Sequence, residues 1–135
     1  KRTAWGSWKS PSNPYVVQPY EFILVFSKEN WKLEGDKDKI DITKEEFIEA
    51  SNSLWDIKPQ TQTKGHPVPF PEKLVYRLIK FYSYQDNIVL DPFGGSGTSA
   101  VVALKTNRKF IYIDKSMEYC KLAENFIANE KSKLF

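Results

Sequence analysis

The chain has 135 residues, 41% of them hydrophobic, which is enough for one domain with a buried core. Its single cysteine excludes an internal disulfide and a cysteine-rich zinc site. The net charge is +3, but residues 29–49 have a net charge of −4 and leave +7 elsewhere, which suits either a phosphate-bearing partner or a solvated surface.

The first half of the chain is predicted to contain one strand and one helix. The continuous apolar run of residues 21–26 predicts a strand buried on both faces. A charged connector follows over residues 30–42. Thr43 and Glu46 have the spacing of a capping box, so we expect an amphipathic helix over residues 44–53.

The second half alternates helices with strands, as expected of an α/β protein. An extended loop rich in proline precedes it. The predicted elements are a helix from Pro71 to Tyr82, a strand over 87–91, a helix over 98–105, a strand over 109–113 and a last helix capped by Ser116.

The most informative stretch is residues 89–98, a strand that runs into a glycine-rich turn and then a helix. Asp91 stands at the carboxyl end of the strand, where α/β sheets bind ligands. Gly95 and Gly97 are the expected contact points, because glycine lets the backbone approach a ligand without a Cβ. The next strand ends in Asp114, 23 residues after Asp91, a separation that suits a pair of ribose hydroxyls.

Three ligand classes compete for this turn. A P-loop requires a lysine after its second glycine, and Thr98 stands there instead, so that class is rejected. Residues 95–100 satisfy the permissive dinucleotide pattern G-x-G-x-x-A, which keeps a nicotinamide or flavin site open. The third class is S-adenosylmethionine (AdoMet), which the Asp-Pro-Phe sequence of residues 91–93 favours.

Asp91-Pro-Phe-Gly-Gly-Ser-Gly-Thr98 resembles the AdoMet-binding motif of the DNA amino-methyltransferases, which methylate adenine N6 or cytosine N4. Two departures from the family are mild: Tyr112 stands where glycine is frequent, and Asp114 where glutamate is frequent. The order of the motifs resembles the C-terminal half of the beta-type enzymes. The resemblance extends over nearly the whole chain, through residues 5–14, 21–28, 54–59, 66–72 and 110–119.

The resemblance implies an α/β fold: a partial, Rossmann-like sheet of the AdoMet-dependent methyltransferase type with flanking helices. It also implies one catalytic domain, of which this chain is the C-terminal part. Residues 1–28 would be its late strand region, 29–53 a charged connector or reduced recognition region, and 54–135 the AdoMet-binding part.

The resemblance further implies which residues hold AdoMet. No residue of this chain is expected to be catalytic or to bind a metal. The methionine and sulfonium end would meet the strand end and the turn, Asp114 would take the ribose hydroxyls, and a loop around the only histidine would close over the cofactor. The full cofactor-binding set is Asp91, Phe93, Gly94, Gly95, Ser96, Gly97, Thr98, Asp114, His66, Pro67 and Phe70.

The family's catalytic motif, an Asp, Asn or Ser followed by Pro-Pro and an aromatic residue, is absent from this sequence. The chain also begins with Lys1, and its only methionine is Met117, so we expect a trimmed or partial polypeptide that is inactive alone. The expected partners are double-stranded DNA and the missing N-terminal half. Alternatives are a nonenzymatic AdoMet- or DNA-binding module and a nicotinamide-dependent oxidoreductase fragment.

Three further expectations concern side chains and location. Cys120 is predicted to be a small, partly buried residue and not a nucleophile, and Trp55 to be a packing residue. The helix over residues 44–53 is expected to direct its glutamates to solvent. No apolar run approaches the roughly 18 residues of a membrane span, and no secretory signal opens the chain. We therefore expect a cytoplasmic protein without a membrane partner.

Overall fold

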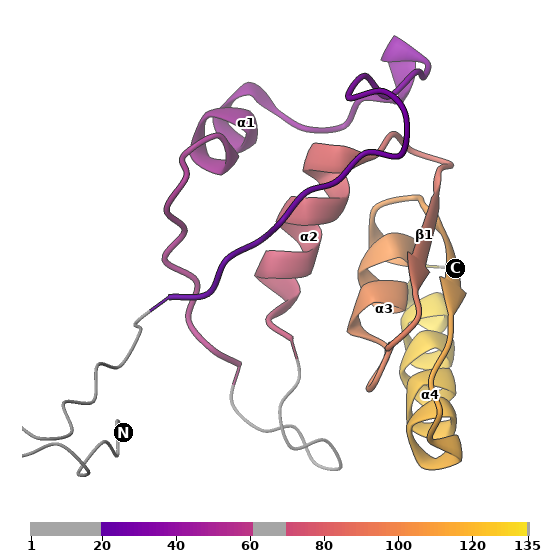
Figure 1. The fold of residues 1–135 in the computed structure, drawn as a ribbon. Helices are drawn as coiled ribbons and strands as arrows, with labels where there is room; N and C mark the ends of the chain where they lie inside the picture. Colours follow the sequence, from indigo (N-terminus) through magenta and orange to yellow (C-terminus); the bar gives the residue numbers. More distant parts are fainter. Residues whose placement is uncertain (1–19, 61–69, 135) are drawn as a thin grey trace, which may run out of the picture. The chain divides into compact units, whose positions relative to one another are not determined.

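The computed structural model describes residues 20–60 and 70–134 (Figure 1). The chain divides after Trp31 into two units, which are described separately. The predicted strand over residues 21–26 is wrong, since this segment forms no strand and all its side chains are exposed, Phe26 by 83%. A strand requires a neighbour to pair its backbone N–H and C=O groups, and the described residues of its own unit supply none.

The second unit is built on one parallel β-α-β unit, as predicted. Strand β1 (Ile88–Asp91) is followed by helix α3 (Thr98–Lys105) and by strand β2 (Lys109–Tyr112). The two strands pair in parallel, with Val89 opposite Phe110 and Asp91 opposite Tyr112. Because the strands are parallel, both carboxyl ends lie at the same edge of the sheet.

The core lies between this sheet and the helices. Helix α3 contacts both strands and also α2 (Glu72–Tyr82) and α4 (Met117–Leu134), so the helices cover one face of the sheet (Figure 1). Alternation along a strand directs every second side chain to this face. The core side chains are Ile79, Val102 and Ala103, with Val75, Val89 and Phe110 packed against them.

The described residues of its own unit leave the opposite face of the sheet uncovered. Its apolar side chains are strongly exposed: Ile88 by 62%, Leu90 by 58% and Ile111 by 48%. Ile113, directly after β2, is 52% exposed. Parallel sheets are almost always covered on both faces, so this arrangement is unusual for a complete domain.

Helix α1 (Lys44–Ala50) begins at Thr43 with the predicted capping box. It ends earlier than predicted, because polar side chains after Ala50 bond to the backbone in place of continuing the helix. Ser51 Oγ donates to the carbonyl of Ile48, and Asn52 Oδ1 accepts from the Leu54 N–H.

The expectation that the α1 glutamates form a solvated face is wrong for Glu46, which bonds to α2. It holds for Glu49, whose side chain is 60% exposed although it also pairs with α2. Glu46 accepts from Lys80 Nζ at 2.7 Å and from the Tyr76 hydroxyl at 3.0 Å. Glu49 pairs with Arg77. The ammonium of Lys80, together with the backbone N–H of Thr43, lowers the pKa of Glu46 to about 2.

A buried ion pair attaches the charged connector to the β-α-β unit. Helix η1 (Lys37–Lys39) lies in this connector, and Asp41 follows it. The guanidinium of Arg108, whose side chain is 0% exposed, donates to both Asp41 carboxylate oxygens at 2.5 and 2.8 Å. Arg108 also donates to the Ser83 hydroxyl and to the carbonyls of Ser83 and Thr106, so all its donors are used within the fold.

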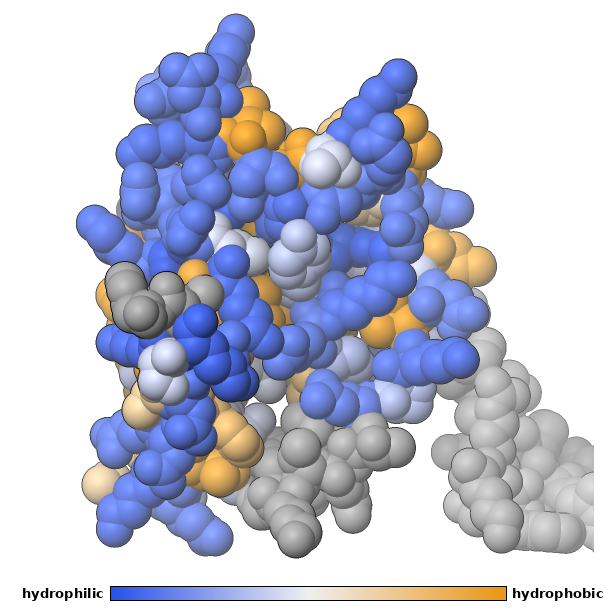
Figure 2. All heavy atoms as spheres, turned by 180° about the vertical axis from the view of Figure 1, so that it is seen from behind, coloured by the Kyte–Doolittle hydropathy of each residue, from blue (hydrophilic) through white to orange (hydrophobic). Residues whose placement is uncertain are grey.

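The face seen from behind is mostly hydrophilic, with separate hydrophobic patches (Figure 2). Among the described residues no helix combines the length and the apolar character that crossing a membrane requires.

Candidate functional site

Asp91, at the carboxyl end of β1, joins the strand to the start of α3. Its Oδ1 accepts a hydrogen bond from the Phe93 N–H at 3.0 Å, and its Oδ2 accepts one from the Ser99 hydroxyl at 2.6 Å. Both carboxylate oxygens therefore support the backbone path of the turn. Ser99 was not predicted as a site residue, although a serine in the first turn of the helix, eight residues after the acid, is a visible signal.

The turn needs glycine at two positions for different reasons. Gly95 has φ of 52° and Gly97 has φ of 86°, in the left-handed region that favours glycine. A Cβ on Gly97 would also lie 2.8 Å from the Cβ of Ala123 in α4. The close packing of α3 on α4 thus depends on the missing side chain at Gly97, while Gly95 supplies the reversal of the backbone.

The predicted ribose acid, Asp114, meets the turn directly. Its Oδ2 accepts from the Gly95 N–H at 2.9 Å, and its Oδ1 accepts from the Ser116 N–H at 2.8 Å. The Gly94 N–H donates to the carbonyl of Ile113 at 2.9 Å, which joins the turn to the end of β2. Asp91 and Asp114 are 23 residues apart in the sequence. The structure brings both acids to the same glycine turn.

Tyr112 belongs to this site although it was not predicted to. Its hydroxyl donates to the Gly95 carbonyl at 2.7 Å, and a Cβ on Gly94 would overlap its ring. Burial, followed by the neighbouring Cys120 and Asp114, raises the pKa of Tyr112 to about 12. The phenol is therefore protonated at neutral pH and acts as a donor. The sequence carried a signal for this role, because Tyr112 lies two residues before Asp114 and alternate residues of an extended chain point the same way.

The remaining predicted site residues that the structure describes lie beside different elements and differ in exposure. Phe93 is 85% exposed beside the turn, and Phe70 is 62% exposed just before α2. The hydroxyls of Ser96 and Thr98 lie 3.5 Å apart at the start of α3. His66 and Pro67 lie outside the described residues.

The expected partial burial of Cys120 and the expected packing role of Trp55 are confirmed. Cys120 is half-buried, with its Sγ 3.7 Å from the Asp114 carbonyl oxygen. Trp55 is a packing residue, because its indole N–H donates to the Ala50 carbonyl and the guanidinium of Arg77 lies 4.8 Å from its ring centroid.

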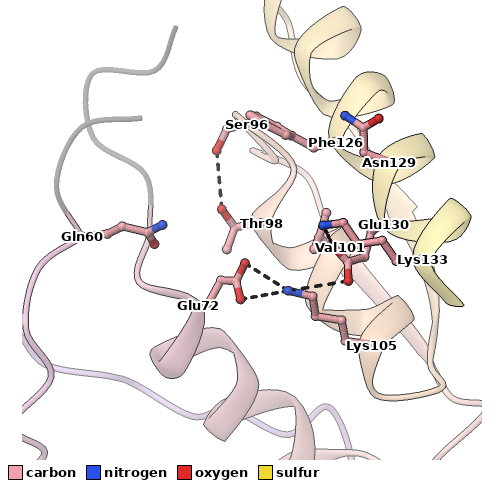
Figure 3. Close-up of a pocket in the computed structure, with 10 residues that line it drawn as sticks. All are labelled: Gln60, Glu72, Ser96, Thr98, Val101, Lys105, Phe126, Asn129, Glu130 and Lys133. Atoms are coloured by element: carbon pink, nitrogen blue, oxygen red, sulfur yellow. Dashed lines mark hydrogen bonds and ion pairs between the residues drawn. The ribbon is translucent and has the colours of Figure 1, made fainter. Parts of the chain in front are cut away.

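A cavity of about 370 Å³ lies beside α3 (Figure 3). Two predicted site residues line it, Ser96 and Thr98. Its charged groups largely neutralise one another, since Lys105 Nζ lies 3.1 Å from Glu72 and 3.9 Å from Glu130. The remaining lining residues are Gln60, Val101, Phe126, Asn129 and Lys133. The acids and backbone N–H groups instead converge at the strand ends and the turn, which form the candidate site.

Known proteins are similar to this chain in sequence. The model of a family described as DNA methylase, the N6/N4 type, matches residues 1–125. The Type II methyltransferase M.BglI of Bacillus subtilis is 37% identical over 125 residues, covering 91% of this chain and 35% of that protein. The Type II methyltransferase M.MthZI of Methanothermobacter thermautotrophicus is 32% identical, covering 96% of this chain and 40% of that protein.

A solved structure is also similar. It is that of a protein assigned as a DNA modification methylase from Thermus thermophilus, in complex with S-adenosyl-L-methionine. The TM-score is 0.64 at 26% identity, and the match covers 83% of this chain and 49% of that one. The present chain therefore spans less than half the length of each of these three proteins.

Proposed function

Because this chain belongs to the N6/N4 DNA methylase family, whose model matches residues 1–125, we propose that it is the AdoMet-binding portion of a site-specific DNA methyltransferase. The methyl group would be transferred to an exocyclic amino group, N6 of adenine or N4 of cytosine. Double-stranded DNA is then the substrate.

The observation that supports the cofactor most strongly is the meeting of Asp114 with the Gly95 N–H at 2.9 Å. A nucleoside ligand has two ribose hydroxyls, and a carboxylate at this strand end can accept a hydrogen bond from each of them. The contacts of Asp114 to Gly95 and Ser116 fix the orientation of the carboxylate beside the turn. The Thermus protein, which has a similar fold, is solved with S-adenosyl-L-methionine.

The described residues fit AdoMet by their chemistry. Asp114 would accept hydrogen bonds from the ribose hydroxyls, and the backbone of Gly95 would lie against the ligand without a Cβ between them. Gly97, whose Cβ position faces Ala123 of α4, would contribute its backbone to the same turn. Asp91 maintains the shape of the turn through Phe93 and Ser99. AdoMet, when bound, would supply an electrophilic methyl group on a sulfonium. We also propose that His66, Pro67 and Phe70 contact AdoMet.

The groups that present the acceptor base would come from outside this chain. The sequence contains no Pro-Pro pair, so the family's Pro-Pro-aromatic motif cannot be supplied here. This chain covers only 35% and 40% of two relatives that match most of its length. We propose that residues 1–28, 29–53 and 54–135 are respectively the late strand region, the connector and the AdoMet-binding part of one catalytic domain.

The uncovered face of the sheet supports the proposal that another segment completes the catalytic domain. Ile88, Leu90 and Ile111 are apolar and about half or more exposed. Since a parallel sheet is normally covered on both faces, another segment of the methyltransferase, in the same polypeptide or a partner chain, is proposed to cover them. Further strands of the methyltransferase would pair the strand edges that no described strand pairs.

A polypeptide limited to residues 1–135 is expected to self-associate and to unfold without a sharp transition, because the described part of the chain leaves one face of the sheet uncovered. Light scattering and urea unfolding followed by circular dichroism would measure both properties. A monomer that unfolds cooperatively would contradict the proposed completion of the sheet by another segment.

The intact protein is expected to bind AdoMet and its demethylated product, and to bind NAD at least about 100-fold more weakly, since an enzyme site distinguishes ligands by several kcal/mol. Isothermal titration calorimetry with the three ligands measures this difference. Tight NAD binding without AdoMet binding would favour the oxidoreductase alternative. AdoMet binding without methyl transfer to DNA would favour the nonenzymatic module.

A further inference from the structure

Two side chains at the end of β2 bind the backbone N–H and the backbone C=O of Gly95, which belong to successive peptide units. Asp114 Oδ2 accepts from the Gly95 N–H at 2.9 Å, and the Tyr112 hydroxyl donates to the Gly95 carbonyl at 2.7 Å. Tyr112 is the last residue of β2 and Asp114 follows two residues later, and their hydrogen bonds show that both side chains reach the turn. Both polar groups of one glycine are therefore fixed by the neighbouring strand.

This double contact matters because Gly95, like the other glycines of the turn, has wide conformational freedom. Its φ of 52° is a conformation that glycine enters and leaves at little cost. Without an external restraint, the peptide groups on either side of Gly95 can rotate and direct their N–H and C=O groups elsewhere. The contacts from β2 select one orientation before any ligand binds, which reduces the ordering cost of binding.

Tyr112 is well suited to this task. Its ring occupies the space that a Cβ on Gly94 would need, so the tyrosine packs directly beneath the turn. The phenol is protonated at neutral pH, since burial raises its pKa to about 12. It therefore remains a hydrogen-bond donor to the Gly95 carbonyl at neutral pH.

We propose that Tyr112 is a positioning residue that sets the affinity for AdoMet by holding the Gly95 carbonyl and, through it, the orientation of the glycine turn. The inference rests on the proposed function, because it names the determinant of affinity within the same AdoMet site. Asp114 acts on the other polar group of the same glycine, so the two side chains work as a pair.

The test is Tyr112→Phe in the intact protein, which removes the hydroxyl and keeps the ring that packs on Gly94. We expect the Kd for AdoMet to rise about 3- to 10-fold, the range of one neutral hydrogen bond. The affinity for DNA should not change, because the turn is assigned to the cofactor. Calorimetry with AdoMet and fluorescence anisotropy with duplex DNA give the two values.

A second readout is amide hydrogen exchange at Gly95 and Ser96, which should become faster in Tyr112→Phe while exchange within α4 stays unchanged. The matched control is Tyr82→Phe on α2, a half-exposed tyrosine away from the turn, for which AdoMet affinity should be unaltered. If the wild-type protein binds AdoMet and Tyr112→Phe binds it equally well, this inference alone is overturned. If the wild-type protein binds no AdoMet, the proposed function is overturned with it.

Discussion

Asp91→Ala is expected to abolish AdoMet binding in the intact protein, weakening it at least about 100-fold. The carboxylate accepts from the Phe93 N–H and from the Ser99 hydroxyl, and hydrogen bonds to a charged acceptor contribute about 1.5–3 kcal/mol each. Removing both leaves the turn without the side-chain contacts of Asp91 to the Phe93 N–H and to Ser99 of α3. Isothermal titration calorimetry with AdoMet measures the loss.

Two control variants separate the contributions of this site. Ser99→Ala removes one of the two donors but keeps the carboxylate, so a smaller loss of about tenfold is expected. Asp86→Asn alters an exposed carboxylate that pairs with Lys39 away from the turn, and AdoMet affinity should be unaltered. An unchanged affinity in Asp91→Ala would show that the cofactor pocket lies elsewhere.

Asp41→Ala is expected to destabilise the protein by about 3–5 kcal/mol, because it leaves a buried guanidinium without its counter-ion. The Arg108 side chain is 0% exposed, and Asp41 binds it through both carboxylate oxygens. The free energy of unfolding, measured by urea denaturation of the intact protein, checks the size of the effect.

The matched control for the buried pair is the exposed pair of Lys39 with Asp86. Solvent screens such a pair, so Asp86→Asn should leave the free energy of unfolding nearly unchanged. Asparagine also tolerates the left-handed φ of 66° at this position. If Asp41→Ala and Asp86→Asn had equally small effects, the Arg108 pair would not be what joins the connector to the fold.

The prediction succeeded where the signal is local. The capping box of Thr43 and Glu46 forms as expected, because its two hydrogen bonds join residues three apart. The β-α-β unit and its acids were predictable because strand, turn and helix patterns are each contained within about ten residues. The cavity beside α3 was not predicted, since it is formed by side chains from several helices.

The prediction failed where the outcome depends on a distant neighbour. Residues 21–26 have the composition of a buried strand, yet they form none, because a strand exists only when another backbone pairs with it. Glu46 was expected to face solvent, but Lys80 and Tyr76 of another helix bind it. In both cases the outcome depends on whether a distant group binds the segment, and the local sequence does not contain that information.

The sequence by itself therefore determined the β-α-β unit, the family resemblance and the positions of Asp91, Asp114 and the glycines. Only the tertiary structure showed that Tyr112 and Asp114 bind the two polar groups of Gly95, and that Asp41 neutralises Arg108. The physical reason is the range of the forces involved. Backbone propensity acts between neighbours along the chain, whereas hydrogen bonds and ion pairs act between groups that only folding brings together.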